Sequence, residues 1–554
     1  MRRISPVAYT LLFLLLALCL PFNTMGQLSA GGVPYCFSRA LAPDTGFITT
    51  GNPPGTDVLA KEDERSPLPY RFAVNLSVDV GTDNSGVWET SGKTRVWRAT
   101  LKSPGALALI LYFDRYRLPE GGRLFLYNPA RTQILGAFTS GNNNRLSTFS
   151  AGLIYGDAVT IEYDAPGDLP PPDLHISEVG HAYRGVANQE KSHGGFNGSG
   201  PCQVNINCDE GGNWQNQKRG VARIIVKRNG GSNWCSGSLV DNVRHDGTPY
   251  LLTADHCGIG CSEEDLSQWI FFFDYESSEC PDPSTEPPLK SMTGATLVAH
   301  GGNAGITGSD FFMVLLNSEV PASYNVYFNG WSRETNPPSP SGVSIHHPQG
   351  DIRKISTYTS PVQPAHWSGN PALCHWRVTW VGTANGHGTT EGGSSGSPLF
   401  DNSGRIIGTL TGGDSSCDSA RLNLPDYYGM FSYHWDKNGT DSSSILKCWL
   451  DPDNTNVMTL KGWAISVREN EREDHVRICP NPFRDQLNLV FDDTESQEVN
   501  VSVFDAIGIR KFSAEMNTHA SREMKIDLQG LARGMYLLMI SDRDRTVVKK
   551  IIRE

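Results

Sequence analysis

The sequence predicts an all-β protein of several domains. Short apolar or alternating runs recur along most of the chain, and clusters of Gly, Asn and Pro separate them. Helical periodicity is scarce between these runs. The chain has 554 residues, and a single hydrophobic core does not organise a chain of that length. We therefore expect three or four domains of roughly 100–200 residues each.

The N-terminus has the features of a secretory signal peptide. Basic Met1-Arg2-Arg3 precedes an apolar run and then small and polar residues, so we expect residues 1–26 to be removed. No later stretch has the roughly 18 consecutive apolar residues that a membrane span needs. The sequence therefore predicts an exported protein with no transmembrane segment after signal removal.

Residues 27–191 read as a β-rich domain, for which a sandwich is the expected architecture. A proline-rich connector at 164–172 and a polar, glycine-rich stretch at 188–200 mark its end, and the latter should be exposed to proteases. The runs that predict strands in this part lie at residues 70–80, 106–114, 122–128 and 157–164.

Residues 192–466 form the next predicted domain, with barrel-like β structure. A charge-dense linker at 467–475 separates it from a small β domain at 476–554. In the domain at 192–466, the runs that predict strands lie at residues 220–227, 235–240, 250–255, 269–275, 311–316 and 405–412. In the last domain they lie at 488–491, 499–505, 524–528, 534–541 and 547–554.

Cysteine usage and charge exclude several functions. Nine of the twelve cysteines lie between Cys202 and Cys448, which in an exported chain indicates disulfides. The alternative is a metal site, but no two CxxC pairs stand at zinc-like spacing, so we expect no metal and no cofactor. The net charge of −12, with no sustained basic stretch, argues against binding to nucleic acid.

The segment GGSSGSPLF at 392–400 points to acyl transfer. It places Ser395 between small residues, where a sharp turn exposes a nucleophilic hydroxyl. The backbone N–H groups of Gly393 and Ser395 would then bind the developing oxyanion. The alternative for a string of Gly and Ser is a flexible loop.

Two further motifs supply the other groups that a catalytic serine needs. In YLLTADHC, His256 follows an apolar strand and is the expected general base. In GSDFFMVLL, Asp310 precedes a buried-looking run and is the expected orienting acid; a plain strand-start aspartate is the alternative. The order His256, Asp310, Ser395 is that of the chymotrypsin-like class rather than that of subtilisin.

Taken together, these motifs resemble the bacterial lysyl endopeptidases over roughly residues 198–465. The resemblance rests on GSGPCQVNINC, CSGSLV, YLLTADHCGIG, TGSDFFMVLLN, VSIHHPQGDIRKIS, GGSSGSPLF, TGGDSSC and WLDP, in that order. It implies a chymotrypsin-like double β-barrel in which Cys202 pairs with Cys417, Cys208 with Cys280, and Cys235 with Cys257. The pairing of Cys261, Cys374 and Cys448 stays open.

The same resemblance implies a preference for basic side chains, lysine above all. It assigns Asp426 to the base of the S1 pocket, where a carboxylate selects Lys or Arg; a turn residue after Pro425 is the alternative. The family stacks a tryptophan on a histidine there. Trp367 matches the tryptophan, but Thr411 stands where the histidine is expected, which leaves the margin of lysine over arginine open.

Other activities remain as alternatives. One is a glutamyl-type or broader-specificity serine endopeptidase, although the strand around Thr411 lacks the histidine that would bind a carboxylate. The other is a catalytically silent adhesin or binding module on the same fold. The filled positions His256, Asp310 and Ser395 argue against it.

Activation should occur by removal of an obstructing segment. Trypsin-like zymogens have an aspartate at the position of Ser394, and serine cannot make the ion pair with a new N-terminus. If the enzyme cuts after lysine, Lys191 in the exposed stretch is the expected self-cleavage site. Residues 27–191 would then be a propeptide that assists folding or inhibits the enzyme.

The C-terminal domain resembles the sorting domain of the Por (type IX) secretion system of Bacteroidetes-type bacteria. The resemblance rests on CPNPF, NVSVFDAIG, IDLQGLARGMY and VVKKIIRE. It implies passage through the periplasm and then release or attachment at the cell surface. The alternative is a carbohydrate-binding sandwich, but tryptophan is absent after Trp463. The expected partners are protein and peptide substrates and the type IX machinery, and we expect a monomer.

Overall fold

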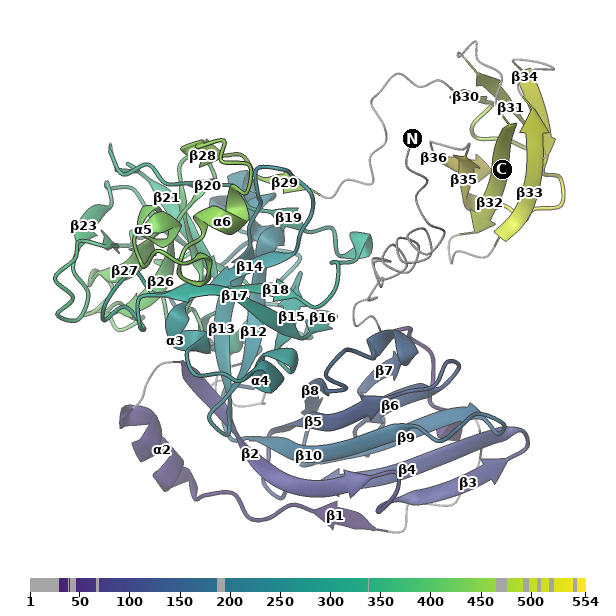
Figure 1. Cartoon of the computed structure of the whole chain (residues 1–554), viewed down its shortest axis with the longest axis horizontal. Helices are drawn as coiled ribbons and strands as arrows, with labels where there is room; N and C mark the ends of the chain where they lie inside the picture. The colour runs from purple at the N-terminus through teal and green to yellow at the C-terminus, as the bar shows by residue number, and fades with distance from the viewer. Residues whose placement is uncertain are drawn as a thin grey trace, which may run out of the picture. The chain divides into compact units, whose positions relative to one another are not determined.

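The chain divides into two compact units, Met1–Ala464 and Ile465–Glu554 (Figure 1). The computed structural model describes residues 29–37, 39, 46–65, 69–186, 195–336, 338–464, 476–491, 498–505, 510–517, 523–541 and 546–554. Strands dominate these residues and helices are short, which confirms the predicted all-β fold class. The expected signal peptide, residues 1–26, and the expected cleavage site, Lys191, lie outside the described residues.

A β-sandwich makes up the N-terminal part of the first unit. One sheet has the order β1-β4-β9-β6-β7 with β3 beside β4, and the strands that face it have the order β2-β10-β5-β8. The bounds are β1 (Phe47–Thr49), β2 (Tyr70–Gly81), β3 (Val87–Ser91), β4 (Thr94–Lys102), β5 (Ala108–Arg117), β6 (Arg123–Tyr127), β7 (Ile134–Phe138), β8 (Phe149–Tyr155), β9 (Ala158–Pro166) and β10 (Asp173–Ala182), with helix α2 at Thr56–Arg65.

Alternation along the strands builds the core of this sandwich. In β4, Trp97, Ala99 and Leu101 share one face, and all three are buried in the same cluster as Leu109 and Leu111 of β5. Side chains at i and i+2 of a strand lie on one face, so each sheet presents one apolar face to the other. The sandwich expected for this part of the chain is therefore present in the structure.

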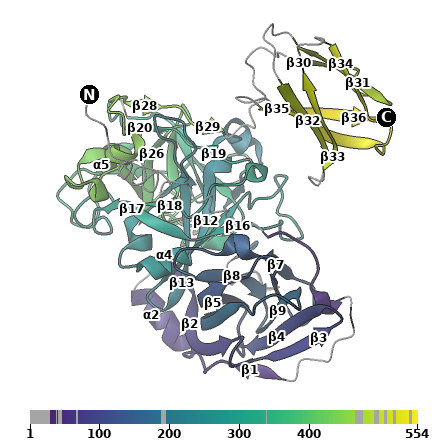
Figure 2. The same ribbon diagram turned by 45° about the vertical axis from the view of Figure 1, so that its right-hand side comes forward.

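The sandwich continues directly into the rest of the unit, which the sequence did not predict. Strand β2 pairs antiparallel with β13 (Gly231–Leu239), so that Val74 lies opposite Gly231 and Tyr70 opposite Trp234 (Figures 1 and 2). The ring of Phe72 stacks on that of Trp234, with centroids 4.3 Å apart. The N-terminal sandwich and the following domain thus share one hydrogen-bonded sheet.

Residues 195–464 contain two mainly antiparallel sheets in succession, the arrangement expected for a double barrel; only β20 and β26 pair in parallel among the described strands of these sheets. In the first, β14 pairs with β13 and β18, β17 with β18, and β12 with β13 and β15. The second has the order β11-β22-β21-β25-β26-β27-β24-β23, with β20 between β26 and β28. The remaining bounds of the first sheet are β12 (Val221–Arg228), β14 (Tyr250–Thr253), β15 (Ile270–Phe273), β16 (Lys290–Thr293), β17 (Ala295–Gly301) and β18 (Phe311–Leu316).

The second sheet and its short connections complete this part of the unit. Its strands are β11 (Val204–Asn205), β20 (Trp331–Ser332), β21 (Gly342–His346), β22 (Lys354–Tyr358), β23 (Gln363–Ala365), β24 (His375–Val378), β25 (Pro398–Asp401), β26 (Ile406–Gly413), β27 (Asp426–Met430) and β28 (Thr459–Leu460). A separate pair consists of β19 (Tyr327–Phe328) and β29 (Trp463–Ala464), and the helices are α3 (Asp255–Gly258), α4 (Glu263–Ser267), α5 (Phe431–Asp436) and α6 (Lys447–Leu450).

The second unit is a small β structure with its own core. Leu487 and Leu489 of one sheet pack in the same buried cluster as Val501, Val503 and Leu538 of the other. One sheet has β30 (Val476–Cys479), β31 (Gln486–Phe491) and β34 (Glu523–Asp527), and the other β33 (Arg510–Asn517), β32 (Glu498–Asp505), β35 (Gly534–Ser541) and β36 (Thr546–Arg553).

Helices contribute little to either unit. The α-helix α2 has 10 residues, and in the part of the chain that the structure describes no helix has the length and apolar character needed to cross a bilayer.

The separate cores predict independent folding of the two units. A chain that ends at Ala464 should keep the melting temperature of the first unit within about 2 °C, because the deleted residues add no side chain to its core. Calorimetry of the truncated and full-length chains measures this. As the matched control, Leu487→Ala should lower only the transition of the second unit, by about 2–5 kcal/mol of stability. Loss of a cooperative transition after truncation would contradict the division.

Candidate active site

The three residues predicted to act together come from different loops of the same region. His256 lies in α3, directly after β14, and Asp310 immediately precedes β18. Because β14 pairs with β18, with Thr253 opposite Phe312, these two side chains meet at one end of the ladder. Ser395 lies in the loop before β25. All three are buried, with exposed fractions of 6%, 0% and 2% in chain order.

Asp310 holds His256 through both of its carboxylate oxygens. His256 Nδ1 lies 2.8 Å from Asp310 Oδ2, and the His256 backbone N–H donates to Asp310 Oδ1 at 2.9 Å. Burial alone would raise the pKa of Asp310, but the charge and hydrogen bonds of His256 hold that pKa below its ordinary value. The carboxylate is therefore ionised at neutral pH and fixes the imidazole orientation.

The other ring nitrogen of the histidine is left for the serine. His256 Nε2 is buried and has no hydrogen-bond partner among the described residues. The loop of Ser395 lies beside it, because the Ser236 backbone N–H donates to the Ser395 carbonyl at 2.8 Å and the Cys235–Cys257 disulfide ties Ser236 to the histidine loop. This arrangement leaves Nε2 free to accept the proton of a nearby hydroxyl.

The backbone around Ser395 presents two unused donors. Neither the Gly393 nor the Ser395 N–H donates to another group in the part of the chain that the structure describes. The Gly393 carbonyl accepts from the Ser236 hydroxyl at 2.9 Å, and Gly393 has φ +94°, a conformation that favours glycine. Two N–H groups without an acceptor, next to a serine hydroxyl, are groups that can bind an oxyanion.

Ser394 is buried, and its hydroxyl is hydrogen-bonded to neighbouring residues of the domain interior. Its hydroxyl accepts from the Glu391 backbone N–H at 3.1 Å and lies 2.8 Å from His346 Nδ1. Burial lowers the pKa of His346 to about 3, so this imidazole is neutral. The Ser394 hydroxyl and the His346 imidazole are thus a buried, neutral pair.

Asp426, the predicted base of the specificity pocket, begins β27 and is fully buried. Its Oδ2 accepts hydrogen bonds from Ser415 Oγ at 2.6 Å, Trp380 Nε1 at 2.6 Å and Thr390 Oγ1 at 2.8 Å. Burial raises the pKa of Asp426, although these hydrogen bonds oppose the rise. No cation pairs with it among the described residues, so it is a buried acidic group supported only by neutral donors.

Trp367 and Thr411 lie together, but the imidazole next to them is one that the sequence analysis missed. The Trp367 ring is half-buried and lies 6.1 Å from the ring of His375, at an interplanar angle of 32°. His375 Nε2 in turn lies 3.0 Å from Thr411 Oγ1. A histidine from β24 thus takes the place beside Trp367 that we expected a residue of β26 to fill.

The local sequence around His375 gave little signal. It stands in CHWRV, an ordinary strand pattern, and its neighbourhood follows from β24 pairing with β27 and β27 with β26. The donors that surround Asp426 were missed for the same reason, since Trp380 and Thr390 lie in the loop between β24 and β25 and Ser415 lies in the loop between β26 and β27.

The described residues form three disulfides, the pairs that the family resemblance implied. They are Cys202–Cys417, Cys208–Cys280 and Cys235–Cys257. The three cysteines left open, Cys261, Cys374 and Cys448, are free, as are Cys36 and Cys479. The disulfide near His256 therefore links β13 to the base of the histidine loop.

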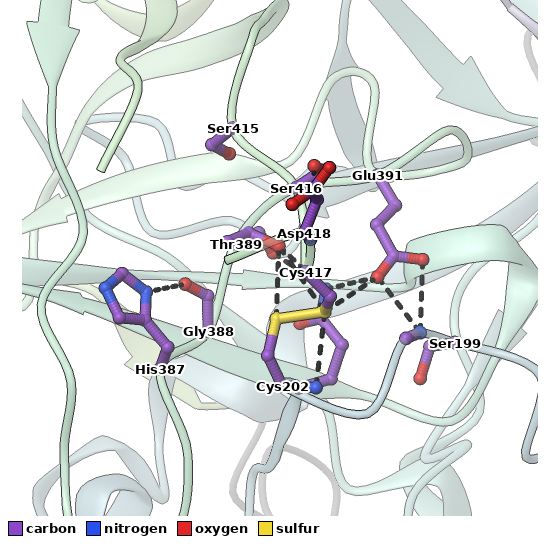
Figure 3. Close-up of a disulfide and its surroundings, with 12 residues drawn as sticks. Ser199, Cys202, His387, Gly388, Thr389, Glu391, Ser415, Ser416, Cys417 and Asp418 are labelled. Atoms are coloured by element: carbon purple, nitrogen blue, oxygen red, sulfur yellow. Dashed lines mark hydrogen bonds between the residues drawn. A yellow bond between two sulfur atoms is a disulfide. The ribbon is translucent and has the colours of Figure 1, made fainter. Parts of the chain in front are cut away.

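Figure 3 shows how the first disulfide supports the loop before Ser395. Cys202–Cys417 lies beside Thr389 and Glu391, and the Glu391 carboxylate accepts the Gly200 backbone N–H at 3.0 Å. Gln203 Nε2 also donates to Glu391, at 2.8 Å. The start of this domain is thereby fastened to both segments that reach Asp426.

The site offers groups for nucleophilic chemistry and none arranged as a metal centre. Across the described ranges, no group of three or more His, Cys, Asp or Glu side chains is placed to hold a metal ion. What the site does contain is a hydroxyl, an oriented imidazole and two backbone donors, which are the parts needed for acyl transfer.

Comparison with known families gives two matches. Residues 196–429 match the model of the lysyl endopeptidase C-terminal domain, and residues 477–554 match that of the secretion system C-terminal sorting domain. A curated relative, the lysyl endopeptidase of Pseudomonas aeruginosa, is 30% identical over 292 residues, which cover 50% of this chain and 60% of that protein. The chain thus spans less than two thirds of its relative's length.

Solved structures with partial similarity include two proteins. The protease Anisep of Arthrobacter nicotinovorans is 18% identical, with a TM-score of 0.28, and the match covers 38% of this chain and 90% of that one. A variant of human heparin binding protein is 14% identical, also with a TM-score of 0.28, and the match covers 44% of this chain and 94% of that one.

Proposed function

We propose that this chain is an exported serine endopeptidase of the lysyl endopeptidase type, specific for basic residues, which the match of residues 196–429 and the similarity to a lysyl endopeptidase support. The observation that carries the proposal is the Asp310–His256 pair, whose free Nε2 lies in the region of Ser395.

In the proposed reaction, Ser395 Oγ attacks the scissile carbonyl and His256 Nε2 takes its proton. The Asp310 carboxylate stabilises the imidazolium that forms, and His256 then returns the proton to the leaving amine. The N–H groups of Gly393 and Ser395 donate to the oxyanion of the tetrahedral intermediate. Water repeats the sequence on the acyl-enzyme and releases the second product.

We assign the preference for lysine to Asp426. A buried carboxylate whose partners are all neutral gains most from a cation, and an extended ammonium side chain of the substrate brings one without a permanent ion pair in the free enzyme. Trp367, with Thr411 and His375 behind it, forms the other proposed wall. We propose that lysine is preferred and that arginine is cleaved more slowly.

The N-terminal sandwich is proposed to be a propeptide that blocks the site from one side. Its strand β2 occupies the edge of β13, and the ring of Tyr70 packs directly against Gly392, the residue before the proposed oxyanion donor Gly393. Trp234 Nε1 donates to the Gly185 carbonyl at 2.8 Å, so both ends of the sandwich meet at the same place. Cleavage at Lys191 would release residues 27–191.

Export follows from the C-terminal unit. Residues 477–554 match a secretion system sorting domain, so the protein is secreted. We propose that the type IX machinery handles this domain, that the domain is removed or used for surface attachment, and that the mature enzyme acts as a monomer on protein and peptide substrates.

The triad assignment predicts a large loss of activity. Ser395→Ala or His256→Ala should lower kcat by a factor on the order of 10⁶, because members of a triad act as a unit. Peptide hydrolysis and labelling by an organophosphate measure this, with Ser403→Ala, an exposed serine of a turn, as the matched control. A folded Ser395→Ala variant that keeps more than about a hundredth of wild-type activity would overturn the function.

The assignment of Asp426 predicts a selective loss. Asp426→Asn should weaken transition-state binding of lysine substrates by about 3–5 kcal/mol, the range for a buried charge that loses its partner, and should spare esters with apolar P1 groups. Because the pKa of Asp426 is raised, the ratio of lysine to apolar cleavage by the wild type should fall as the pH is lowered. Values of kcat/KM for matched Lys, Arg, Glu and Phe substrates test both. A wild-type enzyme that prefers Glu or Phe substrates would refute the assignment of Asp426 to the specificity pocket.

Processing gives a further prediction. Lys191→Ala should leave a longer species of the chain, because the glycine-rich stretch around it is the expected site of the first cut. Active enzyme added to Ser395→Ala chains should cut those that keep Lys191 and spare those that also carry Lys191→Ala, as seen on gels and by N-terminal sequencing. Lys61→Ala, in helix α2, serves as the control and should be processed normally. Unchanged processing of Lys191→Ala would exclude this site.

A further inference from the structure

The backbone of Asp310 has a conformation that the surrounding residues must hold in place. Its φ is +58°, in the left-handed region that residues other than glycine seldom occupy, and the residue is completely buried. Such a conformation persists only where neighbouring groups determine it. Asp310 is also the residue that orients His256, so whatever holds it bears on catalysis.

One set of contacts reaches the Asp310 carboxylate through Thr411. The Thr411 side chain hydrogen-bonds to this carboxylate and helps to lower its pKa. Behind it, His375 Nε2 lies 3.0 Å from Thr411 Oγ1. His375 is fully buried, and burial lowers its pKa to about 4, so the imidazole is neutral and carries one N–H.

A second set of contacts reaches the Asp310 backbone through Thr409. The Thr409 hydroxyl donates to the Asp310 carbonyl at 3.3 Å, and His434 Nε2 lies 3.0 Å from the same hydroxyl. His434 Nδ1 is 2.7 Å from the hydroxyl of Ser309, the residue before Asp310. Burial lowers the pKa of His434 to about 3, so this imidazole is neutral as well.

Hydrogen-bond accounting fixes the direction of both sets. A threonine hydroxyl has one hydrogen, and in each case it goes to Asp310, whose carboxylate and carbonyl only accept. Each hydroxyl must therefore accept from the histidine behind it, which places the proton on Nε2 of His375 and of His434. His434 Nδ1 then accepts from the Ser309 hydroxyl at 2.7 Å, and His375 Nδ1 lies 3.3 Å from the sulfur of Cys374, whose thiol donates to the Gly308 carbonyl at 3.2 Å.

The two threonines come from one strand. Thr409 and Thr411 both belong to β26, whereas His256, which binds the same aspartate, belongs to α3. The histidines come from two further elements, β24 and α5. Asp310 is thereby enclosed by groups from separate parts of the second sheet region, all of which donate toward it.

We propose that His375 and His434 are positioning residues for the catalytic acid, each acting through a threonine hydroxyl, on the carboxylate and on the backbone carbonyl of Asp310. This proposal rests on the proposed function. The neutral imidazoles deliver a directed N–H donor without placing a second cation beside Asp310, so the full negative charge stays available to His256. Loss of either relay lets the carboxylate turn away from the imidazole.

The first experiment measures the carboxylate relay. Thr411→Val, His375→Leu and His434→Leu should each lower kcat for a lysine ester on the order of tenfold or more, and KM should stay within about twofold for His434→Leu, which lies outside the proposed wall of the substrate pocket. The conservative variants Thr411→Ser and His375→Gln keep a hydroxyl and a side-chain N–H and should restore most of the rate. They also provide folded variants if the apolar ones unfold.

A double-mutant cycle separates positioning from a structural role. In an Asp310→Ala background, which removes the carboxylate to be positioned, Thr411→Val, His375→Leu and His434→Leu should change the residual kcat by less than about twofold. An undiminished effect in that background would show that these residues act on folding or elsewhere, and would overturn the proposal. Full activity of the single variants would overturn it too.

Controls keep this result apart from failure of the proposed function. Tyr358→Phe removes another buried hydroxyl of the second sheet, one that donates to the Phe400 carbonyl, and should change stability but not kcat. Thermal melting of every variant monitors folding. Ser395→Ala is measured in the same assay: if it retains activity the proposed function fails, whereas its loss together with wild-type rates in the His375 and His434 variants refutes only the positioning role.

Discussion

The pairing of β14 with β18 is the constraint on which the site depends. It sets Thr253 opposite Phe312, so that the turn carrying His256 and the residue before β18 lie side by side. Side chains alternate along a strand, so a slip of one residue would turn Asp310 to the other face and break both of its hydrogen bonds to His256. The buried apolar runs of the two strands oppose that slip, because it would move their side chains out of the positions in which they pack.

Two buried carboxylates in this region differ in a way that explains their proposed roles. Asp310 has His256 within hydrogen-bond distance, and its pKa is lowered despite burial. Asp426 has only neutral donors, and burial raises its pKa. The partner of the first carboxylate belongs to the protein, whereas the partner proposed for the second arrives with the substrate. Desolvation is common to both, so the position of the counter-charge decides the difference.

Local patterns predicted much of the fold and the residues of the site that stand in sharp turns. Apolar runs bounded by turn residues predicted β5, β9, β12 and β26, because a strand that is buried on both faces is apolar along most of its length. Ser395 and His256 stood in short motifs whose residue types are tied to their chemistry. His375, His434 and the pairing of β2 with β13 carried no such signal, because each depends on which strands meet across the sheet. In the sequence, Thr411 is only a departure from the family's Trp–His pair. Its contact with His375 follows from the fold.

Strand β13 connects these separate features through three consecutive residues. Trp234 pairs with Tyr70 of the N-terminal sandwich, Cys235 is bonded to the loop of His256, and Ser236 binds the backbone of both Ser395 and Gly393. A change at the edge of β13 therefore reaches the base, the nucleophile and the oxyanion donor without any intermediate element. Strand β2 binds the edge of β13 through main-chain hydrogen bonds. An extended peptide has the same backbone donors and acceptors. In the proposed function, substrate backbone and N-terminal sandwich would compete for this edge, which supports the proposal that removal of the sandwich, rather than insertion of a new N-terminus, activates the enzyme.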